Sequence, residues 1–190
     1  MEQQDKKKKI KKGDYGYLQK NKLIQLIISL VLMIMVLVLF YTGYVKYGNN
    51  KNTFTVFAIV SVIPAAKFMV TYIVMMPYKS LSLEKFESIN SFQNVKLLYD
   101  LLITSTEKVI HINIAAIRDN SVYLLVENEK YEKTYVEKYI KSFLEKECKV
   151  TAVRMFRNMK EYKKAVSALE QNEAGKYDKR IRELMTIFSM

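Results

Sequence analysis

The stretch Leu23–Tyr44 reads LIQLIISLVLMIMVLVLFYTGY and contains no charged residue in 22 positions. A helix rises about 1.5 Å per residue, so this stretch would span roughly 33 Å, enough to cross a hydrocarbon core of about 30 Å. A second apolar stretch, Phe54–Pro77, contains one charged residue, Lys67. Together the two stretches predict a transmembrane helical hairpin, with spans at about residues 23–44 and 54–77.

The first stretch has an alternative interpretation as a cleaved signal peptide. However, its apolar run is longer than the roughly 7 to 15 residues of such a peptide, and it lacks a convincing small-x-small cleavage site. We therefore expect a retained helix.

The distribution of lysines predicts the orientation of the hairpin. The chain has a formal net charge of +12, and residues 1–22 contain eight lysines and three acidic residues. The connection Val45–Thr53 contains only Lys46 and Lys51. Because lysine-rich short flanks stay in the cytoplasm, we expect a multi-pass protein of the cytoplasmic (inner) membrane with both termini cytoplasmic.

The basic cytoplasmic arm, residues 1–22, has two compatible interpretations. Its lysines act as a topology signal, and they also attract the anionic headgroups of the bilayer. Nucleic acid is not expected as a partner, because residues 79–190 interleave 20 basic with 16 acidic side chains, as a solvated surface does. The lysines predicted to contact lipid headgroups are Lys6, Lys7, Lys8, Lys9, Lys11 and Lys12.

Lys67 is the main candidate for an intramembrane contact. A lysine at the centre of a span costs roughly 2.5 to 3.5 kcal/mol, and neither span contains Asp or Glu. Pro64 has no amide hydrogen, which releases a backbone carbonyl one turn upstream. One interpretation is that Pro64 and Lys67, beside the small Ala65 and Ala66, bind a protein partner, a second copy or a lipid phosphate. The other is a kinked helix with local water or a deprotonated amine.

Residues 79–190 are expected to form a small cytoplasmic mixed α/β domain, so that the fold class of the whole chain is α+β. The apolar and polar patterns predict a mixed sheet of three or more strands with helices packed against it. A helix is expected from Ser82, followed by a second helical stretch through Leu102, with a cap between them at Asn90 or Ser91. The next expected elements are a β-hairpin of Lys108–Ile117 and Ser121–Glu129, a helix over Tyr131–Leu144 and a strand over Lys149–Phe156. A helix after Asn158 and a helix over Ile181–Phe188 complete the domain.

The β-hairpin offers one candidate catalytic constellation. A three-residue turn, Asp119–Ser121, would place His111 opposite Glu129 and bring Glu127 onto the same face, where such groups could do acid–base work or bind a metal. A two-residue turn would remove this arrangement, and a solvated sheet face explains the same residues. No motif predicts a cofactor, and the single cysteine, Cys148, is typical of a helix end.

Three segments carry a loose resemblance to known proteins: GDYGYL (Gly13–Leu18), FYTGY (Phe40–Tyr44) and KNTFTVFAIVSVIPAAK (Lys51–Lys67). They resemble an uncharacterised group of two-span bacterial membrane proteins with a basic N-terminal arm and a cytoplasmic α/β tail. The resemblance covers about residues 13–80. It implies an architecture, but no activity and no set of functional residues.

The sequence therefore favours a non-enzymatic role, as a membrane-anchored cytoplasmic interaction or scaffold module. Its membrane helices are expected to bind a protein partner or to form a homo-oligomer. One alternative is a membrane-associated enzyme that acts on lipid or nucleic acid through the polar face of the β-hairpin. Another is a small transporter or channel subunit, which would need several copies to enclose a pore.

Overall fold

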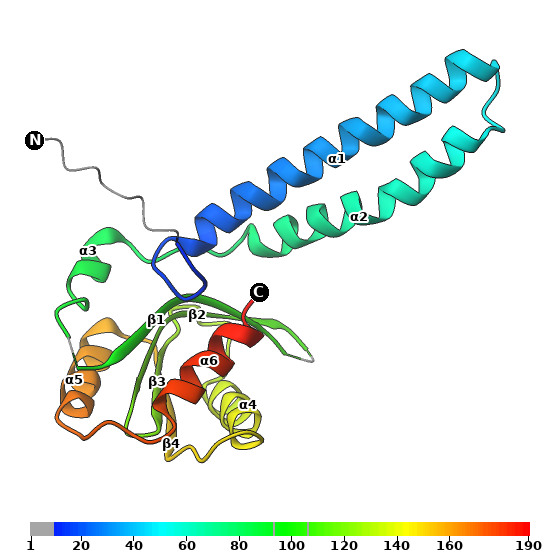
Figure 1. Ribbon diagram of the computed structural model, residues 1–190. Coiled ribbons are helices and arrows are strands. Elements are labelled where there is room, and N and C mark those ends of the chain that lie inside the picture. Colours follow the sequence, from blue (N-terminus) through cyan, green and yellow to red (C-terminus); the bar gives the residue numbers. More distant parts are fainter. Residues whose placement is uncertain (1–9, 93, 106) are drawn as a thin grey trace, which may run out of the picture. The chain divides into compact units, whose positions relative to one another are not determined.

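The structure is a computed structural model that describes residues 10–92, 94–105 and 107–190. It has two long apolar helices and a four-stranded mixed sheet with helices, so the mixed helix-and-sheet prediction is confirmed (Figure 1). Two compact units are present: a hairpin unit, Leu18–Lys79, and an α/β unit that combines the described residues up to Tyr17 with Ser80–Met190. Lys6, Lys7, Lys8 and Lys9 lie outside the described residues.

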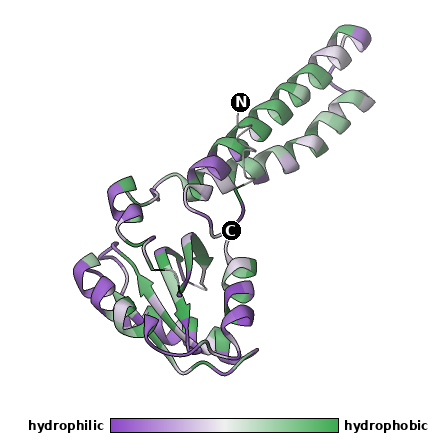
Figure 2. Ribbon diagram, turned by 60° about the vertical axis from the view of Figure 1, so that its left-hand side comes forward, coloured by the Kyte–Doolittle hydropathy of each residue, from purple (hydrophilic) through white to green (hydrophobic). Residues whose placement is uncertain are grey.

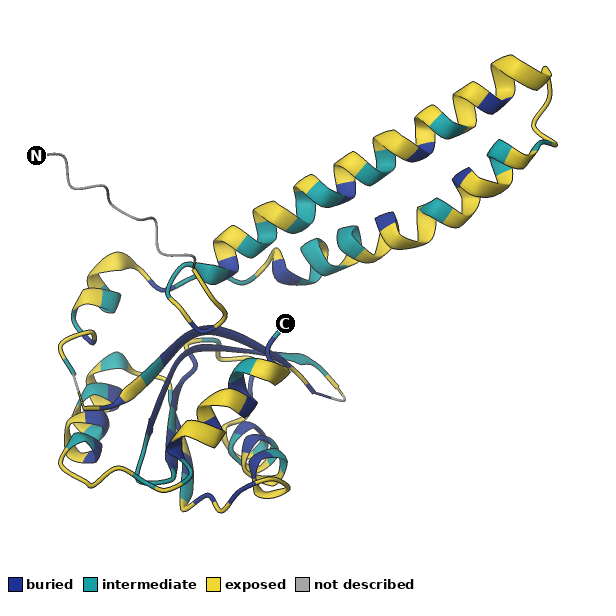
Figure 3. Ribbon diagram, in the orientation of Figure 1, coloured by how far each residue is buried: buried dark blue, intermediate teal, exposed yellow. Residues whose placement is uncertain are grey.

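The hairpin unit contains α2 (Thr53–Met75) and all but the first residue of α1 (Tyr17–Tyr47). Both helices are long and apolar enough to cross a membrane, and most of their surface is exposed (Figures 2 and 3). Helix α1 ends before Gly48, whose φ of +65° suits the left-handed position that follows many helices. Helix α2 begins after Asn52, whose side chain accepts a hydrogen bond from the backbone N–H of Thr55 at 2.9 Å.

Small residues line the contact between α1 and α2. Ser29, Val36 and Gly43 are the buried positions of α1 beyond its first turn, and they recur every seven residues. Ala58 and Ala65 are buried with the same spacing on α2. The Ser29 hydroxyl donates a hydrogen bond to the Ala65 carbonyl at 3.2 Å. Seven-residue spacing of small side chains lets two helices approach closely along one seam, which we call the hairpin seam.

The α/β unit is built on a sheet with the strand order β1-β2-β3-β4. Strands β1 to β3 form an antiparallel meander, whereas β3 and β4 are parallel and α4 connects them. The elements are α3 (Leu83–Glu87), β1 (Lys96–Thr104), β2 (Val109–Arg118), β3 (Ser121–Leu125), α4 (Lys133–Glu145), β4 (Ala152–Phe156), α5 (Met159–Glu170) and α6 (Asp178–Phe188).

Helices cover both faces of this sheet. Residues of α4 and α6, such as Ile140 and Leu184, share one core with the sheet, whereas Tyr162 and Val166 of α5 belong to a second core on the other face. The central strands are consequently buried on both sides (Figure 3). Burial on two faces supplies the apolar area that a domain of this size needs without disulfides.

The strand β1 corrects one prediction, because a helical stretch was expected there. Leu98, Tyr99 and Leu102 have helical spacing in the sequence, yet Lys96–Thr104 pairs with β2 from Lys96↔Ile117 to Thr104↔Val109. A strand buried on both faces has apolar residues at consecutive positions and therefore loses the two-residue alternation that marks a strand. The expected element order thus lacked one strand.

The β-hairpin also has the shorter of its two possible turns. Arg118 pairs with Ser121, and Asp119 and Asn120 form a two-residue turn in which both residues have a φ of +52°. Two left-handed residues are typical of a type I′ turn, whose twist matches that of antiparallel strands. The other helices and strands of the domain lie where they were expected, within a few residues at their ends.

Candidate functional site

The structure does not bring together the three candidate residues of the β-hairpin, His111, Glu127 and Glu129. His111 is buried on β2 and pairs with Leu102, whereas Glu127 and Glu129 follow the end of β3 and are exposed. The Glu127 carboxylate forms an ion pair with Lys85. Among the described residues, no group of three His, Cys, Asp or Glu side chains is placed to hold a metal ion. The two-residue turn therefore separates the three candidates.

Lys67 lies on the outward side of α2. Ala65 is fully buried in the hairpin seam, and Lys67 is exposed. Two residues correspond to about 200° around a helix, so Lys67 and Ala65 point to opposite sides. Pro64 is exposed as well, and α2 continues through it. The structure therefore leaves Pro64 and Lys67 free of the seam and places Ala65 within it.

Neighbouring hydroxyl groups on α2 bind the helix backbone. The Thr71 hydroxyl donates to the Lys67 carbonyl at 2.9 Å, and the Ser61 hydroxyl donates to the Phe57 carbonyl at 2.8 Å. Such bonds to the preceding turn are common for Ser and Thr in helices. Their hydrogens are therefore directed to carbonyl groups of α2.

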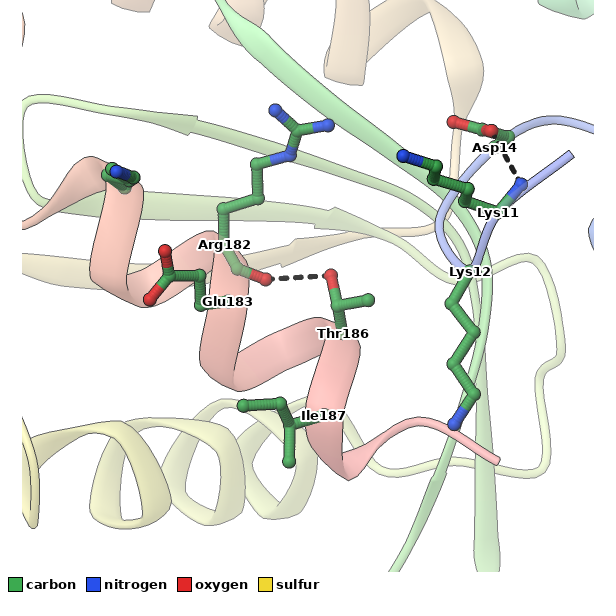
Figure 4. A pocket seen from close by; sticks show the side chains of 8 residues that line it. Lys11, Lys12, Asp14, Arg182, Glu183, Thr186 and Ile187 are labelled. Atoms are coloured by element: carbon green, nitrogen blue, oxygen red, sulfur yellow. Dashed lines mark hydrogen bonds between the residues drawn. The ribbon is translucent and has the colours of Figure 1, made fainter. Parts of the chain in front are cut away.

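Lys11 and Lys12 lie in the α/β unit, where they line a cavity together with α6 (Figure 4). The cavity has a volume of about 530 Å³. Lys12 Nζ donates a hydrogen bond to the Ser189 carbonyl at 2.7 Å, which joins this segment to the end of α6. We call it the α6 basic cavity, and its charged lining residues are Lys11, Lys12, Asp14, Lys179, Arg182 and Glu183.

A second cavity, of about 230 Å³, shares Lys179 and Arg182 with the first. It adds the basic residues Lys96, Arg118 and Lys176. The Arg118 guanidinium is already occupied, because it donates to backbone carbonyls of Asn94 and Asn172. Lysine and arginine residues therefore line both of the cavities that border Lys179 and Arg182 of α6.

The segment Gly13–Gly16 is fixed on β1 through Asp100. The Asp100 carboxylate accepts hydrogen bonds from the Gly16 N–H at 3.1 Å and from the Ser80 hydroxyl at 2.6 Å. The Tyr99 N–H donates to the Gly13 carbonyl at 2.8 Å. Gly13 has a φ of +86°, a conformation that other residues rarely adopt, and a Cβ there would lie 2.7 Å from Leu98 Cδ2. These contacts hold Lys11 and Lys12 beside α6.

Asp100 also changes which side chains of β1 enter each core. Leu98 and then Leu101 and Ile103 face the α4–α6 core, so the alternation slips by one residue at Asp100. Asp100 has a φ of +53°, which is the left-handed region that Asp tolerates better than most residues. At this position the carboxylate accepts its hydrogen bonds from Gly16 and Ser80.

Sequence reasoning did not identify Asp100, Lys179 or Arg182. An acidic residue inside the apolar run LLYDLLIT was a signal for Asp100. For Lys179 and Arg182 no comparable signal exists, because basic residues on the polar side of an amphipathic helix are common.

Comparisons with protein-family models, with curated proteins and with solved structures found no match to this chain. Functional conclusions therefore rest on the hairpin and on the α/β unit themselves.

Proposed function

We propose that the protein is a membrane-anchored interaction module, in which the hairpin α1–α2 holds the chain in a bilayer and the α/β unit is displayed on the cytoplasmic side. The exposed apolar surface of both helices supports this proposal, since Ile34 and Ile63 are 61% and 71% exposed. Water would solvate such a surface poorly, whereas lipid chains cover it. Two spans bring both ends of the hairpin to the same side of the membrane.

Lys67 is the residue that we propose for recognition of a partner within the membrane. It faces away from the hairpin seam, and an ammonium group in hydrocarbon needs an acceptor. Neither span contains Asp or Glu, so a second copy of the hairpin offers no carboxylate within the bilayer. The chemistry favours a different protein with an acidic residue in its own span. This outward position of Lys67 is the observation that carries the proposal.

The test compares three variants of the full chain in intact membranes. Lys67→Leu should preserve insertion but reduce crosslinking to the partner at least tenfold, whereas Lys67→Arg should retain it. Lys51→Leu, in the connection between the helices, removes the same charge and serves as the control. Equal crosslinking by Lys67→Leu and the unsubstituted chain would refute the role of Lys67.

An enzyme acting through His111, Glu127 and Glu129 has no similar support. A catalytic site needs side chains within hydrogen-bonding reach of one reacting group, and these three do not share a face. We therefore retain the interaction module as the proposed function.

A further inference from the structure

We propose that the α6 basic cavity binds a phosphomonoester group, contributed by a lipid headgroup or by a small soluble phosphate ester. Four of its lining residues are cationic and two are acidic. Three features favour this ligand class: the positions of the cationic side chains, the contacts of the two carboxylates, and the volume of the cavity.

The two carboxylates of the cavity do not offset its four cations, and one of them, Glu183, is paired with a residue outside the lining. Asp14 accepts a hydrogen bond from the Lys11 backbone N–H at 2.8 Å, and Glu183 lies 3.7 Å from the Arg180 guanidinium. In contrast, Lys179 and Arg182 form no ion pair with any residue that the structure describes. The lining therefore has cationic groups that its own acidic residues do not neutralise.

Two of the cations extend toward the same space. Figure 4 shows the side chains of Lys11 and Arg182, from opposite walls of the cavity, directed toward one another. Like charges that converge repel each other, and an anion between them reverses the sign of the interaction. Lys179 and Arg182 are three residues apart and so lie on the same side of α6. Arg182 would form the paired hydrogen bonds to phosphate oxygens, with the lysines as additional charges.

The size and composition of the cavity restrict the ligand further. About 530 Å³ exceeds what a lone phosphate ion fills and falls within the range of small-molecule sites. The described lining residues include no aromatic side chain, so the cavity offers no stacking surface for a nucleobase. A phosphate joined to a small polar alcohol, such as glycerol, fits these requirements better than a nucleotide.

Lys12 is close in the sequence to the apolar helix that we propose to span a membrane. Ten residues, Gly13–Lys22, connect Lys12 to the long apolar run that begins at Leu23. The lipid source of the phosphate rests on the proposed membrane anchorage, whereas a soluble source does not.

The first arm of the test measures the soluble source. Full-length protein in neutral phosphatidylcholine nanodiscs is titrated with glycerol 3-phosphate by calorimetry. The second arm adds phosphatidic acid and phosphatidylglycerol in equal amounts to detergent-solubilised protein, and the lipids that copurify are quantified by mass spectrometry. Both lipids are anionic, but only phosphatidic acid has a phosphomonoester.

The variant Lys179→Gln/Arg182→Gln is compared with Lys160→Gln/Lys164→Gln, which removes two charges from the exposed side of α5. We expect binding of glycerol 3-phosphate, or at least fivefold enrichment of phosphatidic acid over phosphatidylglycerol. The α6 variant should reduce the observed binding at least tenfold, and the α5 control should change it less than twofold. Thermal unfolding verifies that each variant is folded.

The possible results distinguish a lipid ligand from a soluble phosphate ester. Enrichment of phosphatidic acid without binding of glycerol 3-phosphate assigns the site to a lipid, and the reverse assigns it to a soluble ester. Binding in neither arm, or equal losses in the α5 and α6 variants, would overturn the proposal. Recovery of the chain from cells in the soluble fraction, without detergent, would refute the membrane anchorage and leave the first arm intact.

Discussion

The carboxylate of Asp100 accepts a hydrogen bond from the backbone N–H of Gly16, 84 residues earlier in the chain, at 3.1 Å. The same oxygen accepts the Ser80 hydroxyl at 2.6 Å. Gly16 directly precedes α1, and four residues separate Ser80 from the end of α2. One buried side chain in the α/β unit thus fixes the two segments that connect this unit to the hairpin.

Replacement of Asp100 should destabilise the α/β unit. Asp100→Ala removes the acceptor of two hydrogen bonds and places alanine at a φ of +53°, at a combined cost of about 2 to 4 kcal/mol. Asp100→Asn retains an acceptor and tolerates this backbone conformation, so it should lose roughly half as much. Thermal unfolding of the full chain in detergent measures both. Equal melting temperatures for Asp100→Ala and the unsubstituted chain would show that these bonds contribute nothing.

Removal of the Tyr99 hydroxyl should stabilise the protein. This oxygen is buried and has no hydrogen-bond partner among the described residues, which costs about 1 to 3 kcal/mol. Tyr99→Phe should therefore raise the unfolding free energy by about 1 kcal/mol. Tyr162→Phe is the matched control, because the Tyr162 hydroxyl donates to the Tyr123 carbonyl at 3.4 Å. A destabilised Tyr99→Phe would indicate a bound water at this oxygen.

The same tyrosine predicts a loss of stability at alkaline pH. Burial raises the pKa of Tyr99 to about 12, above the ordinary value of 10.0. As the pH rises past 10, the unfolded chain loses this proton before the folded protein does, so stability is complete below pH 10 and declines between about 10 and about 12. Tyr99→Phe should show a shallower decline in denaturant titrations at these pH values. If the stability of Tyr99→Phe and that of the unsubstituted chain declined equally with pH, the alkaline loss of stability could not be assigned to Tyr99.

Cys148 should react slowly with thiol reagents while the protein is folded. Its side chain is 7% exposed, burial raises the pKa of the thiol, and Sγ donates to the Leu144 carbonyl at 3.3 Å. The reactive thiolate is therefore both scarce and shielded, and we expect modification roughly 100-fold slower than in denaturant. Absorbance of released thionitrobenzoate measures both rates. Comparable rates in the two conditions would place this thiol at the surface.

Gly43 should be required for the packing of the hairpin. A Cβ at this position would lie 2.6 Å from Phe54 Cβ and 2.7 Å from Asn52 Oδ1, the atom that caps α2. Gly43→Ala should displace Asn52 and cost about 1 to 3 kcal/mol. Thr42→Ala, on the exposed side of α1, provides the control. If the two variants had the same melting temperature in detergent, α1 and α2 would not approach as closely as the structure indicates.

The hairpin helices and most of the α/β elements were predictable because their patterns are local. The apolar run at Leu23–Tyr44 is long enough to predict one continuous helix, and the stripe of Val136, Ile140 and Leu144 marks the core side of α4. In β1 the local pattern failed, since Tyr99 and Leu102 have helical spacing and Asp100 shifts the strand alternation. Pairing with β2 determines this segment, and such pairing is not visible in its own residues.

The α6 basic cavity was beyond prediction for a related reason. Lys11 and Lys12 lie more than 160 residues before Lys179 and Arg182, and the Lys12–Ser189 hydrogen bond joins their segment to the end of α6. Their charges are conspicuous in the sequence, but their proximity depends on the fold of the whole α/β unit. In the β-hairpin the uncertainty was local. The structure has a two-residue turn, and this turn changes which residues lie opposite one another on the two strands.

Labelling of single cysteines in intact cells tests the proposed membrane insertion of the hairpin most directly. In a Cys148→Ser background, Asn49→Cys marks the connection between α1 and α2, and Glu173→Cys marks an exposed position of the α/β unit. A membrane-impermeant maleimide should label Asn49→Cys from outside, and should label Glu173→Cys only after the membrane is permeabilised. Labelling of Glu173→Cys in intact cells, with Asn49→Cys protected, would contradict the account.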